Sequence, residues 1–247
     1  MNAETANQLL EINRRFYTAQ AEEFAETRRR IQPGVRRILD GLPDAAGADW
    51  LDLGCGSGWL AVEWRRAGRV SAYTGLDFSP PLLAEAGRLA TEAGGGGVRF
   101  LHADFIAAGW DAGLPRAGFA GGLCFAVLHH LPGRDGRVGF LSRVAELLKP
   151  GARFWLSVWQ FQHSSRLAAR QIAWERAGLD DSLVEPGDTL LDWRRTPDGI
   201  PALRYVHRFT PDELNELARA SGFEPGETFE SDGRGGRLGL YCGWYRR

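Results

Sequence analysis

Apolar residues recur along the chain with two spacings, one typical of helices and one typical of strands. The order of these spacings predicts the order of helices and strands. Residues 4–40 place apolar side chains at helical intervals, interrupted at Pro33 and Gly34, which predicts N-terminal helices. From residue 50 to residue 159, short apolar runs alternate with helical stretches. The predicted strands are WLDLG, SAYTGLD, VRFLHAD, GFAGGLCFAVL and ARFWLSVW, and the predicted helices are 58–67, 79–93 and 135–148. This alternation is typical of a parallel β-sheet with helices on both faces.

The last third of the chain departs from that alternation. Residues 160–203 are charged and contain Pro and Gly, so we expect an insertion that lies over the sheet. TPDELNELARASG predicts a helix with Thr210 as its N-cap, Pro211 in its first turn and Gly222 at its end. FEPGETFE and GRLGLYCGWYRR predict a closing antiparallel strand pair. We expect one domain, divided into a helical cap (1–44), a ligand-binding core (45–159), a substrate-side insertion (160–203) and a C-terminal helix with its strand hairpin (204–247).

Composition narrows the class of protein. The 247 residues are 44% hydrophobic, which is enough for a substantial core. The net charge of −1 provides no general field that attracts nucleic acid, so any RNA contact must be local. No apolar run approaches the roughly 20 residues of a membrane span, and we expect a cytoplasmic protein without membrane contact. Cys55, Cys124 and Cys242 lack a paired spacing, so we expect neither a disulfide framework nor a metal site.

A glycine-rich loop follows the first predicted strand. LDLGCGSG places Gly54, Gly56 and Gly58 where ligands bind in sheets of this class, at the carboxyl ends of the strands. Glycine lets the backbone turn tightly and lets a ligand approach the main-chain N–H groups. A dinucleotide fingerprint would need glycine in place of Trp59, and no Gly-Lys-Ser/Thr of a phosphate-binding Walker loop follows. The loop therefore predicts a different nucleotide-like ligand.

Acidic residues end the next two predicted strands. Asp77 can accept hydrogen bonds from ribose hydroxyls, and its charge disfavours a ribose phosphate. Asp104 can accept a hydrogen bond from the exocyclic amine of adenine. Phe78 and Phe105 each follow one of these acids and can pack against an adenine ring.

The ordered motifs LDLGCGSG, GLDFSP, HADF, FAVLHHL and LLKPGARFWLSVW make residues 45–160 resemble the class I S-adenosylmethionine-dependent methyltransferases. The resemblance implies a Rossmann-like, doubly wound sheet of seven strands with an antiparallel last strand, and S-adenosylmethionine as cofactor. By this likeness Asp52 lies near the methionine part, Asp77 at the ribose, and Asp104 with Phe105 at the adenine. The cofactor-binding residues it implies are Arg28, Asp52, Gly54, Cys55, Gly56, Gly58, Asp77, Phe78, Ser79, Asp104, Phe105 and Ala126.

Segments outside the core are similar to the wobble-uridine tRNA methyltransferases, which esterify the carboxylate of a carboxymethyl-uridine. They are FYTAQAEEFAETRRRIQP, AVLHHLPGRDGRVGFL, DTLLDWRR and LRYVHRFTPDELNELARASGF. Two positions depart from that family on the substrate side: Gln32 stands where Trp precedes Pro33, and Asp192 replaces the proline before Trp193. Eukaryotic members work with a small zinc-binding activator, so the resemblance implies tRNA and such a protein as partners.

The chemistry of the acceptor decides which side chains are needed. A carboxylate is ionised at neutral pH and needs no general base, but arginine can bind it in a bidentate fashion. Arg28, Arg194 and Arg204 are the candidates for that role. A hydroxyl or amine acceptor would gain from a base, which His129, His130 or His207 could provide.

Trp159, at the end of the fifth predicted strand, is a further candidate for a substrate pocket. Three alternative functions fit these residues. The first function is methylation of a modified uridine in tRNA, with His129, Arg194, Arg204 and His207 as the reaction-side residues. The second is methylation of a small carboxylate or hydroxylated metabolite by the same class of enzyme. The third is a non-catalytic module that binds S-adenosylmethionine and regulates a partner.

Overall fold

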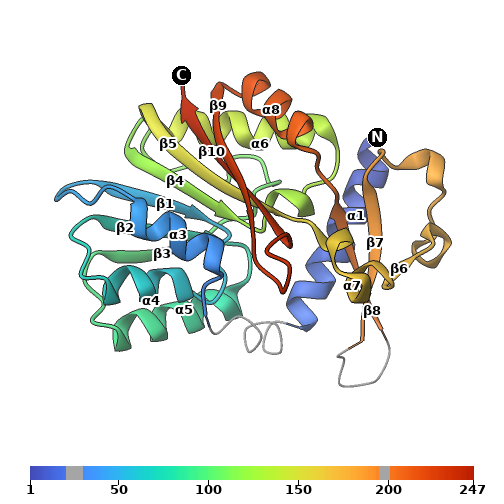
Figure 1. The fold of residues 1–247 in the computed structure, drawn as a ribbon, viewed down its shortest axis with the longest axis horizontal. Coiled ribbons are helices and arrows are strands. Elements are labelled where there is room, and N and C mark those ends of the chain that lie inside the picture. The colour runs from blue at the N-terminus through green and yellow to red at the C-terminus, as the bar shows by residue number, and fades with distance from the viewer. Residues whose placement is uncertain (21–29, 195–200) are drawn as a thin grey trace.

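A seven-stranded sheet forms the centre of the computed structural model, which describes residues 1–20, 30–194 and 201–247 (Figure 1). Its strand order is β3-β2-β1-β4-β5-β10-β9. The strands are β1 (Asp49–Leu53), β2 (Ala72–Asp77), β3 (Val98–His102), β4 (Phe119–Phe125), β5 (Leu148–Trp159), β9 (Phe223–Ser231) and β10 (Gly239–Arg246). β1 to β5 pair in parallel, and β10 runs antiparallel to both β5 and β9. The predicted fold class is therefore confirmed.

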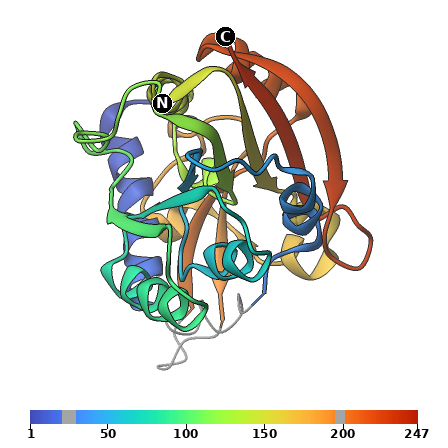
Figure 2. The same cartoon turned by 90° about the vertical axis from the view of Figure 1, so that its left-hand side faces the viewer.

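Helices cover both faces of this sheet (Figure 2). α3 (Pro33–Gly41) and α4 (Trp59–Arg66) pack their apolar sides on one face, next to α5 (Pro80–Glu92). α6 (Arg134–Leu147) and α8 (Pro211–Ala220) pack on the other. Each face thus has its own hydrophobic core, as a doubly wound sheet requires. Among the described residues, no helix is both long enough and apolar enough to cross a membrane.

Helix boundaries follow the local signals with one exception. The hydroxyl of Thr210 accepts a hydrogen bond from the Glu213 N–H at 3.2 Å, which confirms it as the N-cap of α8. Pro33 was expected to interrupt the N-terminal helices, but it begins α3 instead. Proline suits the first helical turn, because its missing N–H would have no partner there.

The insertion forms a second, three-stranded antiparallel sheet with the order β6-β7-β8. Its elements are α7 (Ser165–Ala168), β6 (Gln171–Ile172), β7 (Asp188–Trp193), β8 (Ala202–His207) and the short 3₁₀ turns Phe161–His163, Trp174–Ala177 and Asp181–Leu183; a further turn, Leu128–His130, follows β4. The expected boundary between residues 203 and 204 cuts through β8, so the insertion extends to His207.

One buried amide fastens α1 (Ala3–Ala19) to the small sheet. The Asn13 side-chain oxygen accepts the Tyr205 N–H at 2.9 Å, and the Asn13 amide donates to the Tyr205 carbonyl at 3.1 Å. The side chain thus pairs with the backbone of β8 as a neighbouring strand would. α1 is held beside the cavity described below, although it lies far from β8 in sequence.

Arg69 satisfies the backbone where α3 ends. Its guanidinium donates to the carbonyls of Leu39, Leu42 and Pro43 at 2.8–3.0 Å and stacks 4.4 Å from the Trp64 ring. The last carbonyls of a helix lack hydrogen-bond donors within the helix, and the guanidinium of this buried arginine provides such donors.

Replacing Arg69 by methionine should lower the free energy of unfolding by about 2–3 kcal/mol, because buried carbonyls lose charged donors. Arg66→Met is the matched control. Arg66 is exposed and, among the described residues, pairs with Glu63 alone, so its loss should cost less than about 0.5 kcal/mol. Urea denaturation of both variants measures the difference, and equal losses would contradict the capping role.

Candidate functional site

A cavity of about 560 Å³ opens at the carboxyl ends of β1, β2, β4 and β5. α1 and the insertion form its opposite wall. The predicted site residues that line it are Asp52, Gly54, Cys55, Gly56, Asp77, Phe78, Asp104, Phe105, Ala126, His129 and Arg204. Gly58, Ser79, Arg194 and His207 are not among its lining residues. Arg28 lies outside the described residues.

The three loop glycines have different roles. At Gly54, with φ of +79°, an added Cβ would lie 2.2 Å from a methyl carbon of Val127, so only glycine lets the loop pass strand β4. At Gly58 a Cβ would meet Ala86 at 2.7 Å, so this glycine lets α5 pack closely. At Gly56 an added Cβ would have no atom within 4 Å, so this side of the residue faces open space in the cavity wall, while its N–H donates to Asp77. Gly56 is therefore the glycine that a ligand can approach.

Asp52 is the second-last residue of β1 and is almost fully buried. One of its oxygens accepts a hydrogen bond from the Tyr73 hydroxyl. Burial raises the pKa of Asp52 to about 7, although the bond from Tyr73 acts in the opposite direction. Near neutral pH this carboxyl group is therefore poised between its neutral and ionised forms, and a cation in the cavity would favour ionisation.

Asp77 organises the glycine loop as well as facing the cavity. Its two oxygens accept the Gly56 N–H and the Ser79 N–H, each at 2.9 Å. Burial raises the pKa of Asp77, while these backbone donors favour its charged form. Ser79 was expected at the cofactor, but it serves here as a backbone donor to Asp77 behind the lining.

The adenine-side candidates form a half-buried group. Asp104 accepts a hydrogen bond from Arg14 of α1 at 2.6 Å. Phe105 packs edge-to-face on Trp110, with ring centroids 5.2 Å apart. Phe78 lies 6.1 Å from the Tyr17 ring in the same geometry. α1 therefore contributes a charge and a ring to this part of the cavity, and neither was expected from the sequence.

The two neighbouring histidines differ in what they present. The Trp159 N–H donates to Nδ1 of His129 at 3.3 Å, so the neutral ring carries its proton on Nε2 and is a donor there. Nδ1 of His130 lies 3.1 Å from the Tyr205 carbonyl, which can only accept. Nε2 of His130 therefore accepts from the Tyr17 hydroxyl at 2.7 Å. Of the two, His130 is the one built to receive a proton.

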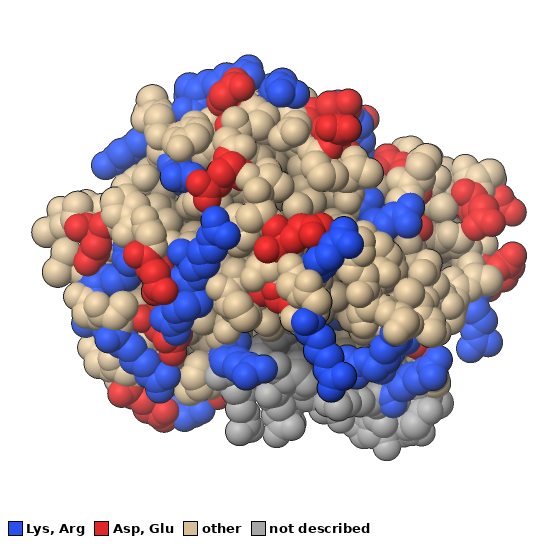
Figure 3. All heavy atoms as spheres, viewed as in Figure 1, with Lys and Arg blue, Asp and Glu red and all other residues tan. Residues whose placement is uncertain are grey.

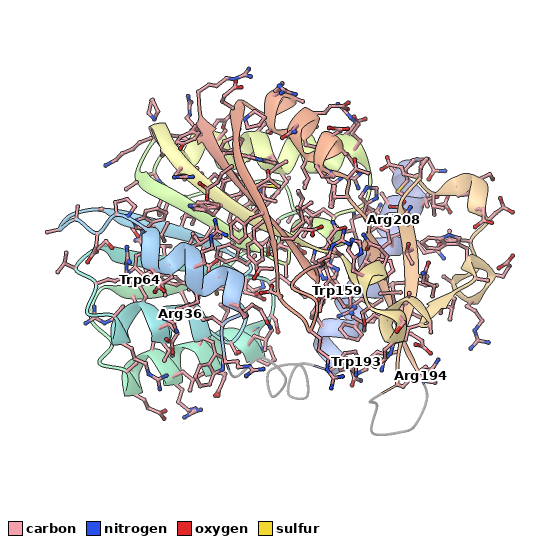
Figure 4. All side chains as sticks on the ribbon, in the orientation of Figure 1. Arg36, Trp64, Trp159, Trp193, Arg194 and Arg208 are labelled. Carbon is pink, nitrogen blue, oxygen red and sulfur yellow. The ribbon has the colours of Figure 1, made fainter. Side chains whose placement is uncertain are left out.

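Arg204 lies in the cavity wall within an aromatic box. Its guanidinium carbon is 4.5 Å from the Trp159 ring, 5.2 Å from Phe16 and 5.8 Å from Trp193. In Figure 4, Trp193 lies below Trp159 and Arg208 lies above both. Only 6% of Arg204 is exposed. The box fixes a planar cation beside flat surfaces on which a ring could stack.

Two predicted reaction-side residues lie elsewhere. Arg194 is exposed and binds Asp192 at 2.7 Å. His207 is buried behind the cavity, where Nδ1 contacts Asp188 at 2.6 Å and Nε2 contacts Glu213 at 2.9 Å. Both ring nitrogens of His207 are thus engaged within the protein, which removes it as a base for a substrate. It joins β7 and β8 to α8 instead.

Comparisons with known proteins agree with this geometry. A family model described as a methyltransferase domain matches residues 51–151. A protein of Encephalitozoon cuniculi, assigned as a methyltransferase, is 30% identical over 85% of this chain and 86% of its own length. The chain belongs to the class I S-adenosylmethionine-dependent methyltransferases. A tRNA (carboxymethyluridine(34)-5-O)-methyltransferase of Schizosaccharomyces pombe is 23% identical over 83% of this chain and 86% of its own.

Solved structures share the fold of this methyltransferase. A Methanosarcina mazei S-adenosylmethionine-dependent methyltransferase has a TM-score of 0.66 and 23% identity, over 88% of this chain and 98% of its own. A Haloferax volcanii protein in complex with the Trm112 methyltransferase activator has a TM-score of 0.65 and 17% identity, over 93% of this chain and 95% of its own. The Burkholderia thailandensis 1,6-didemethyltoxoflavin-N1-methyltransferase with bound S-adenosylhomocysteine has a TM-score of 0.65 and 22% identity, over 100% of this chain and 91% of its own. The family model and the Encephalitozoon cuniculi relative are both described as methyltransferases, which supports an enzyme and not a non-catalytic module.

Several cavity residues escaped the sequence analysis. Arg14 and Tyr17 belong to an amphipathic helix whose pattern signals packing alone. Arg166 and Arg170 lie in the charged insertion, where no motif marks them. Paired aromatic and basic residues in α1 would have been the available signal.

His207 makes the stability of the folded protein depend on pH. Burial disfavours its charged form, but hydrogen bonds to Asp188 and Glu213 outweigh this and raise the pKa of His207 above 6.5. A raised pKa means that its contribution to stability is complete below about pH 6.5 and is lost as the pH rises through the folded-state value.

The unfolding free energy of the native protein should therefore fall more steeply between pH 6 and pH 8.5 than that of His207→Gln. The glutamine keeps hydrogen-bonding capacity but does not titrate. Urea unfolding at four pH values in this range compares the two. Parallel curves for the two proteins would show that His207 does not titrate as described.

Proposed function

We propose that the cavity binds S-adenosylmethionine with Asp77 at the ribose, Asp104 at the adenine amine and Asp52 near the charged methionine end. The residues present fit this group. Gly56 offers an open stretch of backbone, and Asp77 lies at the carboxyl end of β2 next to it. Asp52 has a pKa raised to about 7 by burial, and a nearby cation would favour its ionised form. Phe78 and Phe105 line the same region and offer apolar surfaces.

This assignment predicts that binding of S-adenosylmethionine depends on pH through Asp52. The cofactor is cationic at its sulfur and its ammonium group, so it favours the ionised carboxylate, whose pKa without ligand is about 7. Binding should release a proton below that pH, and affinity should fall about tenfold from pH 8 to pH 6.

Calorimetry in buffers of different ionisation enthalpy measures both the affinity and the released proton. Asp52→Asn is the control, since an amide cannot titrate. It should bind more weakly at pH 8 and show little pH dependence. If the variant retained the native pH dependence, another group would be responsible.

We infer that the methyl acceptor is a carboxylate attached to a planar ring, with carboxymethyl-uridine in tRNA as the first candidate. The observation that carries this is the buried guanidinium of Arg204, held in the cavity wall by Trp159, Trp193 and Phe16. A guanidinium can bind a carboxylate through two parallel hydrogen bonds. The likeness to the fission yeast tRNA enzyme over most of both chains adds support.

The required chemistry agrees with these side chains. S-adenosylmethionine supplies a methyl group activated by a positively charged sulfur. The protein then mainly has to align the acceptor oxygen, and an ionised carboxylate needs no base. Arg204 would orient the acceptor, and the rings of Trp159 and Trp193 would restrict it to one plane.

A second candidate is a small acceptor with a hydroxyl or amine, and the pair Tyr17 and His130 favours it. The Tyr17 hydroxyl lines the cavity and donates to Nε2 of His130, so a proton from an acceptor could move onto this pair. The Burkholderia thailandensis neighbour acts on a small molecule. The two candidates differ in the chemical lability of the product.

Labelled methyl transfer into total tRNA and into a metabolite extract separates them. We expect label in tRNA that mild alkali releases, as a methyl ester requires. Arg204→Gln should lower kcat/KM for tRNA by about tenfold to a hundredfold, because a charged pair is lost, and leave cofactor affinity unchanged.

Arg208→Gln is the matched control, since Arg208 is exposed on the neighbouring turn of chain and does not line the cavity. It should behave like the native protein. Alkali-stable label confined to the metabolite fraction would contradict the carboxylate acceptor and favour the second candidate.

A further inference from the structure

The insertion places two arginines in the cavity wall that no motif identified. Arg166 belongs to α7, and Arg170 follows four residues later, just beyond the end of this helix at Ala168. Their backbone is anchored, because the Arg170 N–H donates to Leu167 and the Arg170 carbonyl accepts the Asp192 N–H, both at 3.0 Å. The two side chains therefore extend from a fixed stretch of chain and not from a loose loop.

The carboxylates that line the cavity already have partners. Asp192 binds Arg194 and Asp104 binds Arg14. The other three acids in the lining accept hydrogen bonds as well: Asp52 from Tyr73, Asp77 from Gly56 and Ser79, and Asp232 from Gly34 and Tyr241. Within the described ranges, Arg166 and Arg170 form no ion pair with any of them. A ligand can supply the anion that these two guanidinium groups lack.

The position of this pair indicates which part of a ligand it would meet. Arg204 is buried in the wall, whereas Arg166 is exposed and Arg170 half-buried, so the pair lies nearer the solvent. Basic side chains gather on this side of the molecule, over α7 and the lower ends of β7 and β8 (Figure 3). An acceptor ring held at Arg204 would leave its attached backbone near Arg166 and Arg170.

We propose that Arg166 and Arg170 bind the phosphodiester backbone of an RNA strand beside the nucleotide that is methylated. Both residues line the same cavity, and each guanidinium group can bind a phosphate oxygen pair through parallel hydrogen bonds. The near-zero net charge of the chain makes such a local contact necessary for RNA. This inference rests on the proposed nucleotide acceptor and names the contact that would hold its backbone.

Fluorescence anisotropy with a labelled anticodon stem-loop of unmodified RNA tests the contact without requiring methyl transfer. Arg166→Gln/Arg170→Gln should weaken RNA binding about tenfold to a hundredfold. It should also reduce the slope of log affinity against log salt by about 1.4, the loss of two single-strand phosphate contacts. Cofactor affinity, measured by calorimetry, should stay unchanged.

Arg176→Gln/Arg208→Gln is the control with the same change in net charge. Arg176 lies in the insertion and Arg208 directly follows it; both are exposed and outside the cavity lining, so this variant should retain native affinity and salt slope. Equal losses in the two double variants, or an absence of RNA binding by the native protein, would overturn the proposal. Uridine monophosphate is the small-molecule probe, and binding of it as tight as that of the stem-loop would also overturn a polymer contact.

The RNA-binding experiment can fail or succeed independently of the test for a carboxylate acceptor. If the stem-loop binds through Arg166 and Arg170 but tRNA gains no alkali-labile label, the phosphate contact stands and the carboxylate acceptor fails. If tRNA is esterified with equal KM by the native and Arg166→Gln/Arg170→Gln proteins, the acceptor stands and the phosphate contact fails.

Discussion

The reversal of strand order between β1 and β4 creates the space in which everything else is placed. β2 and β3 extend from β1 in one direction, whereas β4 and β5 extend in the other. The loops after β1 and β4 therefore diverge and leave a crevice at the carboxyl ends of the strands. The loop after β1 must still pass close to β4, and the contact between Gly54 and Val127 shows how little room remains. The acids that end β1 and β2 face this crevice because strands of one direction end at one edge.

The opposite wall depends on polar contacts between remote segments. Asn13 pairs with the backbone of Tyr205, and His130 contacts the same carbonyl, so α1, β8 and the turn after β4 meet at one point. Behind them, His207 joins Asp188 to Glu213. Buried polar groups of this kind are costly when left unpaired, which favours one arrangement of the insertion on the core. The cavity owes its definite shape to these contacts as much as to hydrophobic packing.

Charge is divided between the two walls. Acidic side chains at the strand ends, such as Asp52 and Asp77, belong to the sheet. The insertion contributes Arg166, Arg170 and Arg204 to the lining. A cationic cofactor and an anionic acceptor would thus each meet groups of opposite charge. In that arrangement the transferred group would lie between them, where alignment is the main contribution that a protein makes to this reaction.

Local signals in the sequence were sufficient for the core of the fold. The alternation of apolar runs gave the five parallel strands and their helices, and Thr210 marked the start of α8, because strand and helix periods and caps are short-range properties. The glycine loop and its acids were found for the same reason. The contacts of Asn13 with His130 and Tyr205 span 117 and 192 residues, and no periodicity reports on such pairs.

The sequence by itself thus determined the class of sheet, the family and the strand-end residues that face the cavity, since each depends on neighbours in the chain. Only the tertiary structure decided that His207 and Arg194 lie outside the cavity and that Tyr17, Arg166 and Arg170 line it. The physical reason is that contacts between residues far apart in the chain, such as those that hold α1 against β8, decide which side chains of these segments face the cavity.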